Sequence, residues 1–116
     1  MIQVNQGFRS GDRRRTMFLP PWEPQSVTWL HPRPACVPER PANLEVMMEM
    51  ATAFSRDFPY LRVDLYSVGR SVSMRSEKQK NSLRVYFGEF TFFPGSGGEL
   101  VDPLSFDLAM GEELRL

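Results

Sequence analysis

Residues Tyr86–Gly98 read YFGEFTFFPGSGG, and this stretch decides the fold. Its alternation predicts a β-strand, and the Pro-Gly-Ser-Gly run predicts a turn that ends it. Glu89 lies inside the strand among aromatic residues, where a carboxylate is costly unless its charge is compensated. Strict alternation assigns to the face of Glu89 the residues Val85, Phe87, Thr91 and Phe93, and to the opposite face Tyr86, Phe90 and Phe92.

A second strand is predicted upstream, where Tyr60–Val68 reads YLRVDLYSV. Leu61, Val63 and Leu65 would face one side, and Arg62, Asp64 and Tyr66 the other. The later strand is predicted over Ser82–Phe93, and the two would pair as an antiparallel hairpin. The polar segment between them is longer than the tight turn that a hairpin needs. We therefore interpret residues 69–81 as a loop insertion.

The strongest helix signal runs from Asn43 to Phe54. Asn43 follows Pro41 and is a suitable N-cap, because its side-chain oxygen can accept from an orphan backbone amide. The apolar residues that recur at helical spacing are Leu44, Met47, Met48, Ala51 and Phe54. A shorter helix is predicted around Pro103–Met110.

The rest of the chain predicts less regular structure. Residues 1–8 begin with a strand-like alternation, and residues 9–15 resemble a basic turn or loop. Eight of the ten prolines lie between Pro20 and Pro59, which predicts extended or irregular chain there.

Composition bounds the class of protein. The 116 residues are 41% hydrophobic with a formal net charge of zero, which fits one small domain and gives no indication of a nucleic-acid surface. No apolar run approaches the roughly 20 residues that a membrane-spanning helix needs. A single cysteine and no export signal favour a reducing cytoplasm.

The candidate site combines the two predicted strands. A hairpin would bring Asp64 and Glu89 together, and two close carboxylates repel one another. A proton, an arginine between them, or a bound cation would relieve this repulsion. With Thr91 they supply the oxygen ligands that Mg²⁺ prefers, and Arg62 on the same face could meet an anionic substrate.

Each of these features also has a simpler structural explanation. Charged residues on one face of a hairpin usually face water. The aromatic residues on both faces of the later strand argue against a strand with one solvent-exposed polar face. The glycines of Pro94–Gly98 would let backbone amides approach an anion, although an ordinary tight turn explains them as well. No Walker loop is present, because no Gly-Lys-Ser/Thr follows.

Three further features are weaker candidates. His31 is the single histidine and lies among prolines, where a surface-loop position is the simpler reading than a metal ligand. A nucleophilic pair of His31 with Cys36 lacks a third orienting group. Arg13–Arg15 could bind phosphate, but a solvated basic turn is the default.

RVDLY (Arg62–Tyr66) followed by YFGEFTFFPGSG (Tyr86–Gly97) resembles the C-terminal half of the ATP-grasp fold, and most closely the TupA-like ATP-grasp family. Upstream, Pro41–Tyr66 resembles the family's helix and its approach to the RVD strand, and Ile2–Trp22 resembles a more variable segment. The resemblance implies an α+β fold, a C-terminal ATP-grasp subdomain fragment with a small antiparallel sheet and one main helix. It implies a single partial domain over residues 1–116.

The resemblance also implies roles for individual residues. Asp64 and Glu89 would be magnesium ligands, and Thr91 would take the position where many ATP-grasp enzymes have Asn. Arg62 would stabilise an acyl phosphate or a substrate carboxylate. The residues that would line the acceptor side of a Mg²⁺-ATP site are Gly95, Ser96 and Gly97.

The implied activity is Mg²⁺-ATP-dependent carboxylate–amine ligation linked to cell-surface polysaccharide and teichuronopeptide biosynthesis, in a family often labelled glycosyltransferase. The lysines that hold the phosphates in such enzymes normally precede this region, whereas here both lysines, Lys78 and Lys80, fall in the predicted insertion. We therefore expect a truncated site that needs a missing N-terminal subdomain or another chain, and whether the chain alone is an enzyme stays open. The alternative is a non-catalytic remnant or a partner-binding module.

Overall fold

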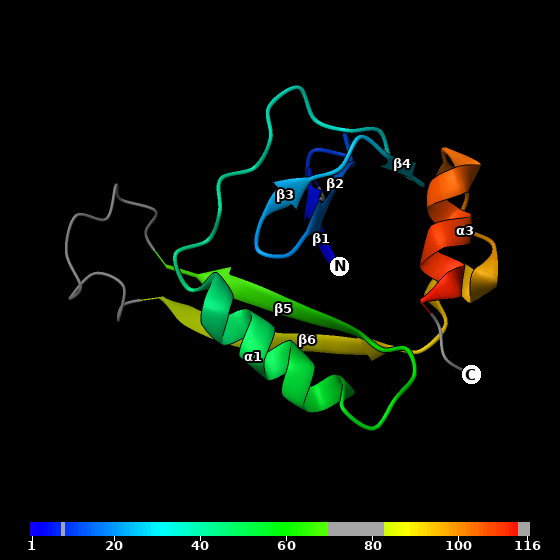
Figure 1. Cartoon of the computed structure of the whole chain (residues 1–116). Helices are drawn as coiled ribbons and strands as arrows, with labels where there is room; N and C mark the ends of the chain where they lie inside the picture. Colours follow the sequence, from blue (N-terminus) through cyan, green and yellow to red (C-terminus); the bar gives the residue numbers. More distant parts are fainter. Residues whose placement is uncertain (8, 70–82, 114–116) are drawn as a thin grey trace. The chain divides into compact units, whose positions relative to one another are not determined.

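The computed structural model describes residues 1–7, 9–69 and 83–113, and Figure 1 shows the course of the chain. It divides into two compact units. The first unit comprises Met1–Glu39 and Gly95–Leu116, and the second comprises Arg40–Pro94. Within these described ranges, two α-helices and small antiparallel sheets fit the predicted α+β class.

The first unit is built on a three-stranded sheet of β1 (Ile2–Gln6), β2 (Arg14–Leu19) and β3 (Glu23–Pro24). A two-stranded sheet pairs β4 (Thr28–Trp29) with β7 (Val101–Asp102), and β7 leads into helix α3 (Leu104–Glu112). The strand near the N-terminus and the helix near Pro103 are thus confirmed. Arg14 and Arg15 belong to β2, so the prediction of a basic loop over residues 9–15 is wrong at its C-terminal end.

The core of the first unit lies on β2 and just after it. Thr16, Met17 and Phe18 are buried, and the ring of Phe18 stacks on Trp22 at a centroid distance of 4.0 Å. Arg15 is also buried. Its Nε donates to Asn5 at 3.0 Å, and its Nη1 pairs with Glu99 at 3.2 Å. A paired and hydrogen-bonded guanidinium can be buried without an uncompensated charge.

The second unit is helix α1 (Leu44–Ser55) packed on one face of the hairpin formed by β5 (Arg62–Val68) and β6 (Arg84–Thr91) (Figure 1). The predicted helix and both strands are confirmed. Leu44 is buried, and Phe54 makes edge-to-face contacts with Phe87 and Phe90. A two-stranded ribbon is marginal alone, so this aromatic contact with α1 is what stabilises it.

The start of α1 differs from the prediction in one detail. Asn43 is the N-cap residue, but its side chain makes no hydrogen bond to a backbone amide of the first turn. Instead its Oδ1 accepts from the hydroxyl of Ser67 at 2.9 Å. Asn43 therefore joins the beginning of α1 to β5.

A β-bulge interrupts the hairpin at the candidate site. Val63 pairs with Phe90 but Leu65 pairs with Phe87, so two residues of β6 oppose Asp64. A bulge adds one residue to one strand and reverses the facing of the side chains beyond it. The prediction of strict alternation along β6 is therefore wrong.

The bulge sorts the aromatic residues of β6 onto different faces from those predicted. Phe87 and Phe90 contact each other at 4.7 Å between centroids, and both contact Phe54 of α1. Tyr86 pairs with Tyr66 and so shares its face. The helix-facing side of the ribbon is thus aromatic, and the opposite side carries the charged residues.

The Pro94–Gly98 run lies in the first unit from Gly95 onward. Pro94–Gly97 form a short 3₁₀ helix, η1, and the amide of Gly98 donates to the carbonyl of Gly95 at 3.0 Å. Gly95 has a φ of +54°, and a Cβ there would lie 2.3 Å from Cγ of Glu99. Glycine is therefore required at position 95 both by the backbone conformation and by the side chain folded over it.

The predicted insertion at residues 69–81 lies outside the described residues, apart from Gly69. None of the helices in the described part of the chain is long and apolar enough to cross a membrane.

Candidate functional site

The candidate site lies on the face of the β5–β6 ribbon that is turned away from α1. Arg62 and Asp64 are two residues apart on β5 and share that face. Glu89 and Thr91 reach the same face from β6. The predicted juxtaposition of Asp64 and Glu89 on neighbouring strands is confirmed. Arg62 pairs with Thr91 and Val63 with Phe90, which brings Glu89 next to Asp64 at the point where the bulge begins.

Arg62 joins the two carboxylates. Its Nε donates to Asp64 Oδ1 at 2.8 Å and its Nη2 donates to Asp64 Oδ2 at 3.2 Å, which makes a bidentate pair. The same Nη2 donates to Glu89 Oε1 at 2.9 Å. The hydroxyl of Thr91 donates to that oxygen at 3.3 Å. We call these four residues the Arg62 cluster.

The Arg62 cluster answers the question raised by Glu89. Of the three ways to relieve the repulsion between its carboxylate and that of Asp64, the structure uses the guanidinium of Arg62. The side chains of Arg62 and Asp64 are 25% and 32% exposed, whereas Glu89 is 62% exposed. The ion pair of Arg62 with Asp64 is therefore partly shielded from water, whereas water screens the ion pair of Arg62 with Glu89.

The protonation of Arg62 follows from this geometry. Burial lowers the pKa of Arg62, but the hydrogen bond to Asp64 and the negative charges of Asp64 and Glu89 outweigh it and raise that pKa above its ordinary value. A raised folded-state pKa means stability that is fully present below the unfolded-state value and is lost as pH rises through the folded one. Arg62 is thus charged throughout the physiological range.

The donor set of the Arg62 cluster suits a hard cation. Asp64, Glu89 and Thr91 offer only oxygen atoms, and Mg²⁺ is commonly held by one or two carboxylates together with phosphate and water. Glu89 uses only Oε1 in the contacts above, which leaves Oε2 for another ligand. Among the described residues no group of three or more His, Cys, Asp or Glu side chains converges as a metal site, so a cation here would depend on phosphate oxygens as well.

Gly88 was missed by the sequence reasoning and is central to the site. A Cβ at Gly88 would lie 2.7 Å from Cε2 of Tyr66 and 3.0 Å from the carbonyl oxygen of Asp64. A glycine inside an aromatic strand is a known signal of a bulge or a close backbone approach, and it was available in the sequence.

The other predicted residues lie elsewhere. Gly95, Ser96 and Gly97 belong to the first unit and the Arg62 cluster to the second, so their joint action stays a prediction. Cys36 is an exposed free thiol, and no hydrogen bond joins it to His31 in the described structure. Arg15 is buried against Glu99 and is not available for phosphate.

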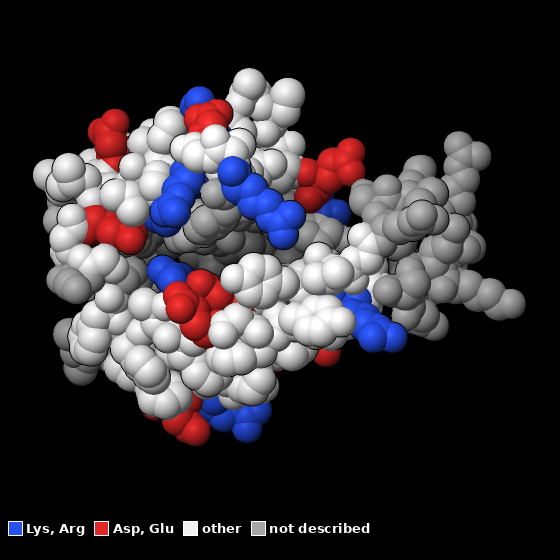
Figure 2. Space-filling model, turned by 180° about the vertical axis from the view of Figure 1, so that it is seen from behind, with Lys and Arg blue, Asp and Glu red and all other residues white. Residues whose placement is uncertain are grey.

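Figure 2 shows acidic and basic side chains interspersed on a mostly uncharged face of the described residues. No field of one sign dominates that face, in keeping with the zero formal net charge.

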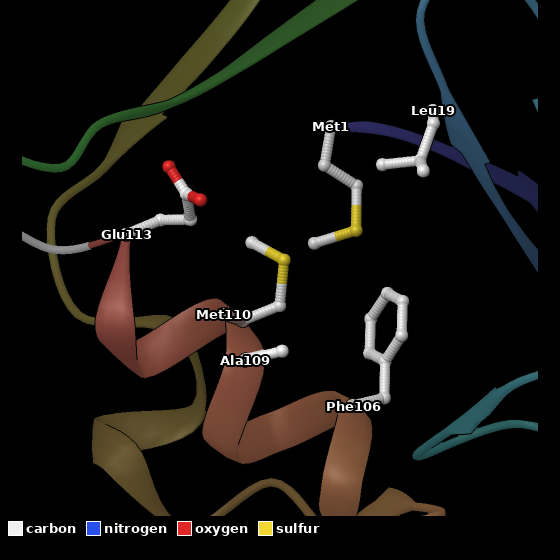
Figure 3. Close-up of a pocket in the computed structure, with 6 residues that line it drawn as sticks. All are labelled: Met1, Leu19, Phe106, Ala109, Met110 and Glu113. Carbon is white, nitrogen blue, oxygen red and sulfur yellow. The ribbon is translucent and has the colours of Figure 1, made fainter.

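An apolar pocket of about 430 Å³ lies within the first unit. Figure 3 shows the side chains of Met1 and Met110 pointing toward one another, with Phe106 and Leu19 beside them. Among the described residues that line the pocket, Glu113 is the one ionisable side chain, and the other five are apolar.

Comparisons with known proteins place the chain in a family. No curated protein and no solved structure gives a significant match. The model of the family described as TupA-like ATPgrasp matches residues 36–115, a span that contains the Arg62 cluster and well over half of the chain. The chain, which carries two paired strands with RVD on one and Glu-x-Thr on the other, therefore belongs to the TupA-like ATP-grasp family.

Proposed function

We propose that the chain contributes the magnesium-binding half of an ATP-dependent carboxylate–amine ligase site, linked to cell-surface polysaccharide biosynthesis. The observation that carries the proposal is the Arg62 cluster, in which one guanidinium joins two carboxylates on a paired hairpin and a hydroxyl donates to one of them. Membership of the ATP-grasp family supports ATP as the ligand, because enzymes of this fold use ATP with Mg²⁺.

Asp64, Glu89 and Thr91 would hold the cation. When bound, Mg²⁺ would neutralise charge on the phosphate oxygens during phosphoryl transfer. The chain's own contribution is positional. The pairing of β5 with β6 fixes the oxygen donors on one face, and the pairs Arg62–Thr91 and Val63–Phe90 set their register.

Arg62 has a second part in the proposal. Its contacts with Asp64 and Glu89 hold the two carboxylates close together on one face of the ribbon. With Glu89 engaged by a cation, the N–H of Arg62 Nη2 that now donates to Glu89 would be available to an anionic group of the substrate, while the bonds to Asp64 would remain. Gly95, Ser96 and Gly97 would line the acceptor side, where backbone amides can meet an anion.

Lysines that clamp the phosphates are not part of the Arg62 cluster, and we propose that another segment or chain supplies them. A chain lacking that clamp would bind Mg²⁺-ATP only weakly. Millimolar Mg²⁺-ATP should perturb the backbone amide NMR signals of Asp64 and Glu89, with little or no turnover. Isothermal titration should show no micromolar site, and micromolar affinity would refute the need for a further clamping segment.

Matched variants test the assignment of the cation ligands. Asp64→Asn and Glu89→Gln should each weaken the magnesium dependence of ATP binding by about tenfold, because each removes one anionic ligand. Asp57→Asn is the control, since Asp57 is an exposed acid in the same unit. Magnesium dependence that is unchanged in both site variants would contradict the proposal.

A second candidate is a non-catalytic partner-binding module. It is favoured by the exposure of large apolar side chains on the second unit. Phe87 and Phe90 are 50% and 42% exposed although they face α1, and Phe93 is 82% exposed. Such incomplete burial is expected where another chain completes the core. Retention of partner binding in Asp64→Asn, with no ligand response of the wild-type chain, would favour this second function.

A further inference from the structure

Strand β1 (Ile2–Gln6) is an outer strand of the sheet in the first unit, whose strand order is β1–β2–β3 (Figure 1). Among the described residues, β1 pairs with β2 along one edge, and no strand pairs with its other edge. Proteins usually blunt an open edge with a charge, a proline or a bulge, because its unpaired backbone groups attract other strands. The sequence of β1, IQVNQ, has no charged side chain and no proline, and it pairs with β2 in an unbroken register.

The hydrogen bonds of β2 show which residues of β1 face the open edge. In an antiparallel pair, opposite residues alternate between bonded pairs, which exchange backbone hydrogen bonds, and non-bonded pairs, whose backbone groups point away from each other. The amide of Arg15 on β2 donates to the carbonyl of Pro32 at 3.0 Å. The carbonyl of Met17 on β2 accepts from the amide of Gln25 at 2.8 Å. Arg15 and Met17 thus direct their backbone groups away from β1.

Gln3 and Asn5 present their backbone groups at the open edge. They are the partners of Met17 and Arg15, so their own N–H and C=O groups point away from β2. Within the described part of the chain, no hydrogen bond reaches these outward groups. The two side chains are already linked, because Gln3 Nε2 donates to Asn5 Oδ1 at 3.3 Å and Arg15 Nε donates to the same oxygen at 3.0 Å. The edge therefore offers two backbone donors and two acceptors on a strand that β2 holds in place.

We propose that β1 is a dimerisation edge, which pairs antiparallel with β1 of a second copy of this chain. A two-fold axis at Val4 places Gln3 of each copy opposite Asn5 of the other, and both of these pairs can exchange two backbone hydrogen bonds. All the outward groups of Gln3 and Asn5 in the two strands are then satisfied. A two-fold axis at Gln3 or at Asn5 would instead match one of these residues with a residue outside β1.

The side chains make β1 complementary to itself. On one face, Val4 would meet Val4 of the second copy, and Ile2 would meet Gln6. On the other face, the side-chain amides of Gln3 and Asn5 would lie opposite one another and can hydrogen-bond across the pair. No like charges would be placed opposite each other, because the side chains of β1 carry none. The strand lies in the first unit and outside residues 36–115, so the dimer and the proposed function of the Arg62 cluster are tested separately.

Sedimentation equilibrium of the full chain, combined with amide hydrogen exchange at low and high protein concentration, tests the dimer. We expect a weak, concentration-dependent monomer–dimer equilibrium, because the interface is small. The amides of Gln3 and Asn5 should become protected from exchange as the dimer forms. The amide of Val4 already faces β2, so its protection should not depend on concentration, and it serves as the internal control. A chain that stays monomeric at millimolar concentration would refute the proposal.

A mixture of ¹³C-labelled and unlabelled chains identifies the register. An NOE between Hα of Val4 in a labelled chain and Hα of Val4 in an unlabelled chain arises only between copies. We expect this NOE, because residues of a non-bonded antiparallel pair lie with their Cα atoms about 4.5 Å apart. A dimer that lacks the NOE, or in which Gln3 and Asn5 exchange as in the monomer, uses another surface and overturns the proposal. Protection of both amides at every concentration would also overturn it, since the edge would then be covered within one chain.

Replacement of Gln3 by proline removes one outward N–H and leaves the hydrogen bonds between β1 and β2 in place. Each dimer then loses two of its backbone bonds, so the Kd of the dimer should rise about tenfold or more. Gln3→Thr keeps the amide and is the matched control, with a Kd within about threefold of the wild type. Equal dimerisation of Gln3→Pro and Gln3→Thr would contradict the proposal, and amide spectra of β2 confirm that each variant is folded.

A charge pair at Val4 tests the axis independently of proline. Val4→Lys and Val4→Glu each place like charges opposite one another in the homodimer, which should weaken it, whereas a mixture of the two places opposite charges there. We expect the mixed pair to associate more tightly than either variant alone. A mixture that associates no more tightly than the separate variants would show that Val4 does not lie at the axis.

Discussion

Replacement of Arg62 by methionine tests the central electrostatic claim, because it removes the charge and keeps an apolar stem of similar length. The change deletes the bidentate bond to Asp64 and the single bond to Glu89. It leaves two carboxylates on one face with no compensating charge. We expect a lower free energy of unfolding for the second unit. We also expect the ion pair with Asp64 to contribute much more to that free energy than the ion pair with Glu89.

The magnitude follows from the exposure of each partner. Hydrogen bonds to charged groups contribute roughly 1.5 to 3 kcal/mol when shielded, and exposed ion pairs contribute about 0 to 1 kcal/mol. The pair of Arg62 with Asp64 is 25% and 32% exposed, so we assign it about 1 to 1.5 kcal/mol. Glu89 is 62% exposed, and its share is at most about 0.5 kcal/mol. Arg62→Met should therefore cost about 1 to 2 kcal/mol.

Urea unfolding followed by the amide NMR signals of β5 measures the loss within the unit that contains the cluster. Double-mutant cycles of Arg62→Met with Asp64→Asn and with Glu89→Gln separate the two pairs. Arg84→Met on β6 is the control, since the described structure gives Arg84 no ion pair. A coupling energy to Glu89 that equals or exceeds the coupling to Asp64 would refute the reasoning from exposure, and a neutral Arg62→Met would refute the claim that this guanidinium holds the site together.

Gly88→Ala should cost about 1 to 3 kcal/mol, because the added Cβ meets the ring of Tyr66 and the carbonyl oxygen of Asp64. Gly111→Ala in α3, where a Cβ meets nothing within 4 Å, should be neutral or stabilising. Thermal unfolding of both variants checks the contrast. Arg15→Met should cost about 3 to 5 kcal/mol by leaving the carboxylate of Glu99 unpaired in a buried position. The double variant with Glu99→Leu should recover much of that loss, and a double variant no more stable than the single one would show that the pair is not coupled. Phe54→Ala should cost about 1 to 2 kcal/mol, less than for a fully buried ring, because Phe54 is 41% exposed; urea unfolding that shows no loss would mean that its ring contacts do not anchor α1.

Much of the second unit follows from the sequence alone. The helical spacing of apolar residues from Leu44 to Phe54 locates α1, and the alternation in Arg62–Val68 locates β5, because these periods are imposed by backbone geometry. The same patterns were sufficient to place Asp64 and Glu89 on neighbouring strands. The family resemblance carried by those residues is confirmed by the family model.

The facing of β6 was decided only by tertiary structure. One extra residue opposite Asp64 moves Phe87 to the side of Phe90 and Phe54, where the rings pack together. Gly88 signals that β6 can bulge, but the residue of β5 that lies opposite the bulge is defined only by the pairing of the two strands. The choice of Arg62 as the group that compensates Glu89 depends on the same pairing.

Ion pairs between distant segments likewise cannot be predicted from the local sequence. Arg15 and Glu99 are 84 residues apart, and nothing in the basic run around Arg15 predicts that its guanidinium is buried against that carboxylate. Local periodicity fixes which segments form helices and strands, because it reflects backbone geometry within a few residues. Which charges are paired is fixed by contacts between distant segments, as in the pair of Arg15 with Glu99 and the contact of Arg62 with Glu89.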